Sequence, residues 1–337
     1  MEPEPSIRQT GEDALVARLL PLMPSNPSLE TGPGDDCAII RGSGNRQLLL
    51  KTDCVVEGMH FLPGTDPELI GRKALARAVS DIGAMGGTPL HALVTLFVHA
   101  DRPISQVEGI YRGMGRLARQ FGISIAGGES SGLPADGLII NVALTGEVEE
   151  GKAVLRSTAR AGDLIAVTGT LGGSFPTGHH LSFMPRVREG GILAASGVAT
   201  SMMDLSDGLG TDLPRLAAAS GLGFRIHEEL LPVRPGVTAA QAVGDGEDYE
   251  LLVTFRPGDR ERAARLAAEH FPETPLTVIG EMTAPFPQVT GTSASPLRIG
   301  GRATQNACGI IPPPFPPLSP AACKAGAVHT RLCPDNA

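Results

Sequence analysis

The sequence predicts a two-domain protein of the α/β (α+β) class. Segments with helical periodicity alternate with short apolar segments typical of strands, which favours helices packed on sheets. The length of 337 residues exceeds the size at which a single hydrophobic core stops growing, about 250–300 residues. Glycine is abundant, with 43 residues, and this indicates many tight turns between the elements.

The first half of the chain reads as alternating helices and strands. A short amphipathic helix is expected over residues 11–23, and strands are expected in "CAII" and "QLLLKTD", joined by the glycine-rich "RGSGNR". The next expected elements are a helix, a strand, a helix and two strands, at residues 67–87, 90–100, 105–122, 123–128 and 138–150. Paired glycines end the helix that begins at Pro67.

A second domain is expected to begin near residue 150, where the polar "LRSTARAGD" leads into the apolar "LIAVTGT" and a glycine-rich turn. Further along, we expect a helix, a strand and a helix at residues 205–223, 249–255 and 259–271. The predicted domains are therefore residues 1–150 and 151–310. Residues 311–337 are rich in proline and predict an extended or disordered tail.

Composition excludes several classes of function. The formal net charge of −8 argues against a nucleic-acid-binding surface, because no basic run offsets it. Five cysteines without CxxC spacing favour reduced thiols over a disulfide framework or a zinc site, and Cys37 and Cys54 are expected in the core. No signal-peptide pattern and no run of 18 apolar residues occur, so a soluble cytoplasmic protein without membrane contact is expected.

Acidic residues recur where apolar segments begin or end. Asp35 and Asp36 precede a strand in "GPGDDCAII", Asp53 closes the next strand, and Asp81 lies late in a helix. Further acids occur in "AGGESSG", "MMDLSDGLGTDL" and "GDGEDYELL": Glu129, Asp204, Asp207, Asp212, Glu247 and Asp248. Each alone has an ordinary interpretation, such as a solvated turn, a helix cap or a surface charge.

Together, these acids predict a metal site. Loops at strand ends commonly meet in sheets covered by helices, and carboxylates brought within a few ångströms repel one another unless cations lie between them. Magnesium is the expected cation, because it takes hard oxygen ligands and bridges carboxylates to substrate phosphates.

Glycine-rich segments could supply the phosphate contacts. "TGTLGGS", "AGGESSG" with Gly128, and "SDGLG" either present backbone N–H groups to phosphates or form tight turns only. Neither a P-loop motif nor the protein-kinase triplets occur. His60 either contacts an anionic group or packs in the interior, and Arg156 either reaches a nucleotide phosphate or lies exposed at the domain connection.

Six segments in order make the chain resemble the thiamine-monophosphate kinase family, within the superfamily that includes aminoimidazole ribonucleotide synthetase. They span roughly residues 10–285 and are "GPGDDCAII", "KTDCVVEGMHF", "GRKALARAVSDIGAMGG", "GGESSG", "MMDLSDGLGTDL" and "GDGEDYELL". The resemblance implies an aminoimidazole ribonucleotide synthetase-like fold. Its N-terminal mixed sheet with helices binds ATP and metal and forms the barrel of a homodimer, and an α/β domain follows.

The resemblance also implies an activity. The family transfers the γ-phosphoryl group of ATP directly, in line, to thiamine monophosphate, with several magnesium ions. Carried over by position, the metal ligands are Asp36, Thr52, Asp53, Asp81, Glu129, Asp204 and Asp207, of which Asp53, Asp81 and Asp207 are expected to be catalytic. ATP would contact Arg156, Ser206 and Gly128, and thiamine monophosphate would contact His60 and Glu247.

Three features depart from the family pattern. "GGESS" stands where "GGDTT" is usual, so Glu129 replaces an aspartate. Lys51 stands where a small hydroxyl residue is common and could supply a charge in place of one ion. A late G-Y-x-H-F motif is missing.

Two alternatives therefore stay open. One is another ATP-dependent enzyme of the superfamily with a different small acceptor. The other is a non-catalytic nucleotide-binding dimer, although such a protein has no physical reason to keep so many mutually repelling carboxylates.

Overall fold

The computed structural model of the chain describes residues 6–285, 298–299 and 302–303. The chain divides into two units, one of residues 1–18 with 308–337 and one of residues 19–307. The expected helix at residues 11–23 is found as α2 (Glu12–Leu19) and η1 (Leu20–Leu22), after the short α1 (Ile7–Thr10). The predicted tail lies outside the described residues. Within the described residues, no helix combines the length and the apolar character that a membrane-spanning segment requires.

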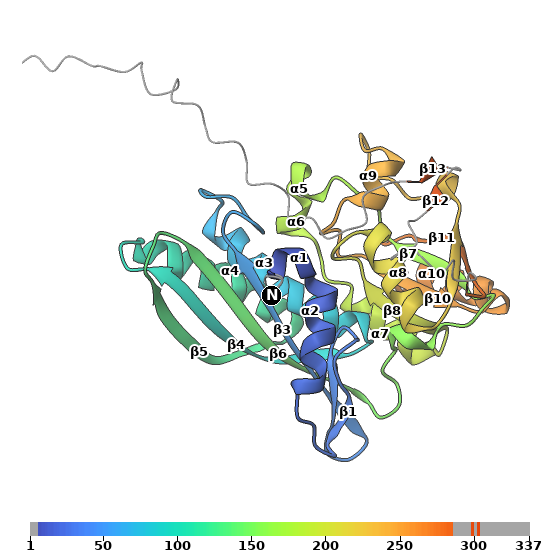
Figure 1. Cartoon of the computed structure of the whole chain (residues 1–337), viewed down its shortest axis with the longest axis horizontal. Helices are drawn as coiled ribbons and strands as arrows, with labels where there is room; N and C mark the ends of the chain where they lie inside the picture. The colour runs from blue at the N-terminus through green and yellow to red at the C-terminus, as the bar shows by residue number, and fades with distance from the viewer. Residues whose placement is uncertain (1–5, 286–297, 300–301, 304–337) are drawn as a thin grey trace, which may run out of the picture. The chain divides into compact units, whose positions relative to one another are not determined.

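Six strands of the second unit form a mixed sheet in the order β1-β2-β3-β6-β4-β5 (Figure 1). In chain order they are Leu29–Thr31, Ala38–Arg41, Arg46–Val56, Thr88–His99, Ser124–Leu133 and Leu138–Glu149. Neighbouring strands run antiparallel, except that β4 and β5 are parallel. The prediction of an N-terminal mixed sheet with helices is confirmed.

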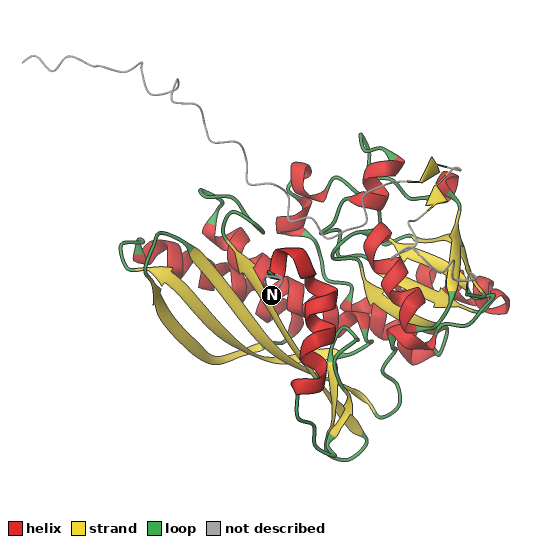
Figure 2. Cartoon of the chain, viewed as in Figure 1, coloured by secondary structure: helices red, strands yellow, loops and turns green. Residues whose placement is uncertain are grey.

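Helices α3 (Pro67–Ala84) and α4 (Ile104–Phe121) cover one face of this sheet (Figure 2). Helix α3 begins after Asp66, whose side chain accepts a hydrogen bond from the Glu68 N–H. After the helix the chain changes direction at Gly86, which has a φ of 74°. Its buried apolar side chains join those of α4 and of strands β3, β4 and β6 in one core: Ile70, Leu75, Val79, Ile110, Leu117, Leu49, Val94 and Val142.

The opposite face of the sheet carries exposed side chains. Successive residues of a strand point to opposite faces. In β3, Leu49 and Val55 are fully buried, whereas Leu50 and Cys54 are exposed. The expectation that Cys54 is a core residue is therefore wrong, because the strand period places it on the other face from Val55; Cys37 is buried as expected.

The second sheet contains five antiparallel strands in the order β8-β10-β7-β11-β9. From β7 to β11 they are Leu164–Thr168, Ala199–Asp204, Gly223–Ile226, Leu251–Phe255 and Leu276–Thr283. Helix α8 (Leu209–Ala219) packs on one face, and α7 (Val187–Ser196) and α10 (Arg260–His270) pack on the other. Every residue of β10, which lies between β8 and β7, is buried, and four of its five residues are apolar.

Short elements complete the described structure. They are α5 (Ser174–Thr177), α6 (His179–Ser182), α9 (Ala239–Gly244), η2 (Arg156–Thr158), η3 (Glu228–Leu230), η4 (Pro257–Asp259), β12 (Arg298–Ile299) and β13 (Arg302–Ala303).

Strand β5 is longer than the sequence predicted. A tight turn was one interpretation of "AGGESSG", but all of it lies within β5, and its residues other than Ala126, which lies at a register shift, pair with β4. A Cβ atom at Gly128 would lie 1.8 Å from the Val94 carbonyl oxygen. This glycine therefore allows the backbones of the two strands to approach closely. Glycine in a strand often serves this purpose rather than forming a turn.

Glycine also sets the approach of the two helices. A Cβ atom at Gly113 of α4 would lie 1.8 Å from the Glu68 carbonyl oxygen of α3, so Gly113→Ala is expected to lower the free energy of unfolding by about 3 kcal/mol. At Gly115 the nearest atom, Arg119 Nη1, is 3.6 Å away, so Gly115→Ala is expected to raise stability by up to about 1 kcal/mol. Urea unfolding of the full chain measures both changes, and equal effects would contradict the close helix contact.

Candidate active site

Three of the predicted acids converge in the second unit. Asp36 precedes β2, Asp81 lies in the last turn of α3, and Asp204 ends β8. One carboxylate oxygen from each lies within 4.8 Å of the other two, and all three residues are at most 5% exposed. Ends of three elements distant in sequence thus form one buried acid cluster.

Burial and mutual repulsion shift the ionisation of this acid cluster. Burial is the largest cause that raises the pKa of Asp81 well above its usual range, and Lys51 only partly opposes it. Burial, together with the charge of Asp36, raises the pKa of Asp204 to about 6. The negative charge of the acid cluster is therefore incompletely balanced by the protein.

Protein cations lie against several of the acids. Arg156, from η2, forms an ion pair with Asp36, and Lys51 Nζ lies 2.7 Å from Asp81 Oδ1. Within the described part of the chain, Asp204 has no such cation within 4.0 Å. Burial disfavours the charged form of Lys51, but Asp81 and Asp53 outweigh it, so the pKa of Lys51 is raised.

The acid cluster fits a divalent cation. Asp36 Oδ2 is buried and has no hydrogen-bond partner among the described residues. A buried carboxylate oxygen without a donor is unfavourable unless an ion completes its contacts, and carboxylate oxygens are the ligands that Mg²⁺ prefers. Asp36, Asp81 and Asp204 are thus the residues that could hold such an ion.

Asp53 lies beside this acid cluster rather than within it. Its Oδ1 atom is 3.0 Å from Arg77 Nη2 of α3. The other Arg77 nitrogen, Nη1, lies 3.5 Å from Glu247 Oε1. One guanidinium group therefore joins a predicted metal ligand to a predicted substrate contact.

Thr52 and Glu129 lie on the exposed face of the first sheet, away from Asp53. Thr52 Oγ1 donates a hydrogen bond to Asn141 Oδ1 at 3.1 Å. Asn141 pairs with Thr95, which in turn pairs with Glu129 across β4 and β5. The structure does not bring these two predicted ligands to the acid cluster, because strand alternation places their side chains on the opposite face. Gly128, a predicted ATP contact, lies on the same strand as Glu129.

The loop after β8 carries Ser206 and Asp207. The side chain of Asp207 is 51% exposed and forms an ion pair with Arg215, away from the acid cluster. The Ser206 carbonyl oxygen accepts a hydrogen bond from the Glu247 N–H at 2.8 Å. The Asp207 N–H donates a hydrogen bond to the side chain of the buried Asp212. Burial and the charge of Asp207 raise the pKa of Asp212 to about 8. These contacts hold the loop after β8 against the loop before β10.

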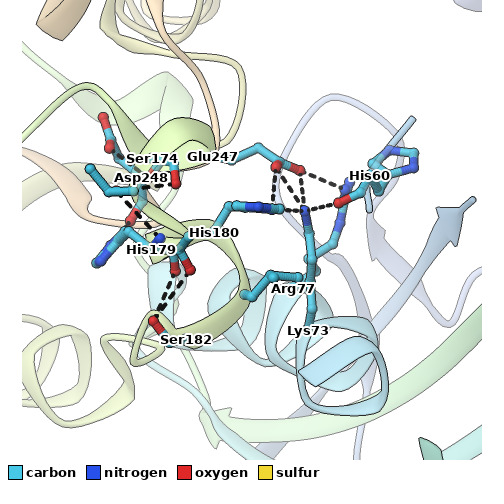
Figure 3. Close-up of polar contacts among 12 residues, drawn as sticks. His60, Lys73, Arg77, Ser174, His179, His180, Ser182, Glu247 and Asp248 are labelled. Atoms are coloured by element: carbon cyan, nitrogen blue, oxygen red, sulfur yellow. Dashed lines mark hydrogen bonds and ion pairs between the residues drawn. The ribbon is translucent and has the colours of Figure 1, made fainter. Parts of the chain in front are cut away.

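Glu247 and His60 meet through a buried lysine (Figure 3). Lys73 Nζ, from α3, lies 2.7 Å and 2.9 Å from the two carboxylate oxygens of Glu247 and also donates to the His60 carbonyl oxygen. His180 Nδ1, from α6, lies 2.9 Å from Lys73 Nζ and 3.3 Å from Glu247 Oε2. We call Lys73, Glu247, His60, His180 and Arg77 the lysine cluster.

Charges within the lysine cluster are set by the same contacts. Burial lowers the pKa of Lys73 to about 8, although Glu247 opposes the shift. Burial disfavours ionised Glu247, but His180 and Lys73 outweigh it and lower the pKa of Glu247. Burial and the charge of Arg77 lower the pKa of His60 to about 4, so this imidazole is neutral at neutral pH.

Lys73, Arg77 and His180 were not predicted as site residues. A signal was available for two of them. Lys73, Arg77 and Asp81 recur every four residues in a helix rich in apolar residues, which places three ionisable groups on one face. For His180, which lies in a four-residue helix, no local pattern indicates the contact.

The chain matches two family models, described as AIR synthase related protein, N-terminal domain (residues 34–148) and C-terminal domain (residues 157–289). It is 32% identical to the thiamine-monophosphate kinase of Bacillus subtilis (strain 168) over 298 residues, 80% of this chain and 91% of the relative. It is 34% identical to that of Escherichia coli (strain K12) over 303 residues, 81% of this chain and 91% of the relative.

Solved structures are similar as well. AaThiL complexed with AMPPCP and TMP matches with a TM-score of 0.75 and 28% identity, covering 90% of this chain and 97% of that chain. Thiamine monophosphate kinase from Aquifex aeolicus matches with a TM-score of 0.66 and 28% identity, covering 81% of this chain and 94% of that chain.

Asp204→Asn is expected to remove most of the stabilisation that Mg²⁺ gives to the chain. The pKa of Asp204 is raised from its usual 3.8 to about 6 in the folded protein. The metal-free folded state therefore binds the carboxyl proton of Asp204 more tightly than the unfolded state does. The free energy of unfolding therefore falls as pH rises from about 4 to about 6, and a bound cation reverses this loss. At neutral pH without metal, the variant is expected to be at least as stable as the wild type.

Thermal unfolding with and without Mg²⁺ measures this effect. Asp163→Asn is the matched control, because Asp163 is also buried but accepts hydrogen bonds from the Arg160 N–H and the Thr200 hydroxyl. This control is expected to lose stability but to keep the Mg²⁺ response. An unchanged response in Asp204→Asn would remove Asp204 from the metal site.

Proposed function

Since the chain belongs to the thiamine-monophosphate kinase family of AIR synthase related proteins, we infer that it phosphorylates thiamine monophosphate with ATP, giving thiamine diphosphate and ADP. The observation that carries this inference is the buried acid cluster of Asp36, Asp81 and Asp204. It lies in a chain that spans 91% of the length of curated kinases. AaThiL is solved with AMPPCP and TMP, which supports a nucleotide and an acceptor phosphate as the ligands.

Mg²⁺ is the cation that we propose for the acid cluster. Asp36, Asp81 and Asp204 would hold it, and when bound it neutralises phosphate charge and fixes the reacting geometry. Thr52, Asp53, Glu129 and Asp207 stay predicted ligands. Of these four, Asp53 lies near enough to the acid cluster for its charge to raise the pKa values of Lys51 and Asp81.

The proposed reaction is one direct transfer. An oxygen of the acceptor phosphate attacks the γ-phosphorus of ATP, and the bond from that phosphorus to the β,γ-bridging oxygen breaks. The electron pair of this bond leaves with ADP. No protein base is required, because the second pKa of a phosphate monoester is about 6 and its oxygens are largely ionised at neutral pH.

Arg77 supports the proposed arrangement of the two substrates. Its guanidinium group contacts both Asp53 and Glu247, so the proposed acceptor contact Glu247 lies next to the proposed metal ligand Asp53. Lys73 is fully buried and contacts Glu247, so it would act on a substrate only through that carboxylate. Arg156 and Ser206 are the proposed contacts of ATP, and Arg156 is held in place by Asp36.

Assay of the full chain with ATP, Mg²⁺ and thiamine monophosphate tests the function. Equal amounts of ADP and thiamine diphosphate are expected by chromatography. ADP without thiamine diphosphate would favour another acceptor, and Mg²⁺-dependent ATP binding without turnover would favour a non-catalytic dimer.

Asp53→Asn is expected to lower kcat by about a hundredfold or more, since it removes a charge from the phosphate site. Asp101→Asn, whose side chain is 91% exposed, is the control and is expected to keep full activity. Near-normal activity of folded Asp53→Asn would refute the assignment of Asp53.

A homodimer is the proposed assembly, with the exposed face of the first sheet as its interface. Leu50 and Leu93 are 37% and 53% exposed on this face, in strands that lie on either side of β6. Burying apolar side chains of this kind against a second copy removes them from water. We also propose a cytoplasmic location, because the reaction consumes ATP.

Leu93→Glu is expected to convert the dimer to a monomer, because a carboxylate would be buried at the centre of the proposed interface. Light scattering after size-exclusion chromatography measures the mass. Ile104→Glu is the control, since Ile104 is 77% exposed at the start of α4, on the other side of the sheet. A Leu93→Glu dimer, or a monomeric wild type, would contradict this interface.

A further inference from the structure

Lys51 is the protein cation that lies against Asp81 of the acid cluster. Strand β3 directs Lys51 and Asp53 toward α3, because both side chains contact residues of that helix. Lys51 Nζ is 2.7 Å from Asp81 Oδ1, and the exposed fractions of the two side chains are 22% and 7%. An ion pair this enclosed keeps a fixed geometry, unlike a pair between two solvated side chains.

The charges around the acid cluster do not balance. It contains three carboxylates, and among the described residues the cations that form ion pairs with it are Lys51 and Arg156. One negative charge remains if all three acids are ionised. Without Lys51 two would remain, and the acid cluster would attract a divalent cation more strongly.

Contacts also differ among the three acids. Lys51 occupies the Oδ1 atom of Asp81, whereas the Oδ2 atom of Asp36 is buried without a partner among the described residues. An incoming cation thus finds an open oxygen at Asp36, but it must compete with an ammonium group at Asp81. Lys51 and a metal ion are alternative partners for the same carboxylate.

We propose that Lys51 is a tethered cation that takes the place of one metal ion at Asp81 and weakens metal binding to the acid cluster in the absence of nucleotide. Lys51 is a positioning residue in this role, because it acts through Asp81. The proposal rests on the magnesium site of the proposed function. Its physical consequence is that the acid cluster retains room for a metal that arrives with the substrate phosphates, instead of being saturated by free metal.

Calorimetric titration of the full chain with MgCl₂ or MnCl₂, without nucleotide, tests the proposal. Lys51→Met removes the charge and keeps a side chain of similar length, and it is expected to tighten metal binding by about tenfold, the size of effect that a neighbouring unit charge has on a site. Lys51→Gln, which also removes the charge, is expected to change affinity in the same direction. Lys51→Arg is expected to keep wild-type affinity.

Lys152→Met is the matched control, because Lys152 is exposed and the charge change is identical. It is expected to leave metal affinity within twofold of the wild type. A merely structural role of Lys51 would weaken metal binding in the variants rather than strengthen it. If folded Met and Gln variants bind metal as the wild type does, or more weakly, or if no protein binds metal, the proposal is overturned.

The same titration separates this proposal from the proposed reaction. A wild type that fails to phosphorylate thiamine monophosphate, but whose metal affinity rises when Lys51 is neutralised, would contradict only the reaction. Normal kinase activity with metal affinity independent of residue 51 would contradict only the role of Lys51.

Discussion

Repulsion among three buried carboxylates is the constraint on which the site depends. Asp36 and Asp81 belong to the part of the chain built on the first sheet, and Asp204 ends a strand of the second sheet. Their oxygens lie within 4.8 Å of one another away from bulk water, where like charges repel strongly. Lys51 and Arg156 reduce this repulsion, and the packing of α3 against both sheets holds the acids in place despite the remainder.

In the lysine cluster the buried charge is a cation instead of a set of carboxylates. Lys73 has no exposed surface, and its ammonium group is satisfied by Glu247, His180 and the His60 carbonyl oxygen. Glu247 and Tyr249 have φ angles of 67° and 52°, which non-glycine residues seldom adopt. Such backbone strain persists only where surrounding contacts determine the conformation, and the ion pair with Lys73 is one of these contacts.

Much of this structure could be predicted from the sequence, and the failures have physical causes. The positions of Asp36, Asp81 and Asp204 at the ends of apolar segments indicated their convergence correctly. The side-chain directions of Thr52 and Glu129 depend on strand register, which a list of acidic and hydroxyl residues does not contain. The spacing of Lys73 in its helix indicates a shared face with Arg77 and Asp81, but its role depends on Glu247, which is 174 residues away in the sequence. The strand expected at residues 123–128 was too short because glycine in a turn and glycine at a close strand contact look alike in sequence.

Arg156 gives the connection between the two sheets a specific structural role. Its backbone N–H donates to Asp35 Oδ2 at 3.1 Å, and its carbonyl oxygen accepts from the hydroxyls of Ser201 and Ser220 at 3.0 Å and 2.8 Å. A single residue of the connection is thus anchored to both halves of the unit while its side chain contacts the acid cluster. An insertion or deletion directly beside Arg156 would therefore displace a residue that contacts the acid cluster as well as the connection. A split protein or a circular permutation that cuts the chain at Arg156 would break these contacts.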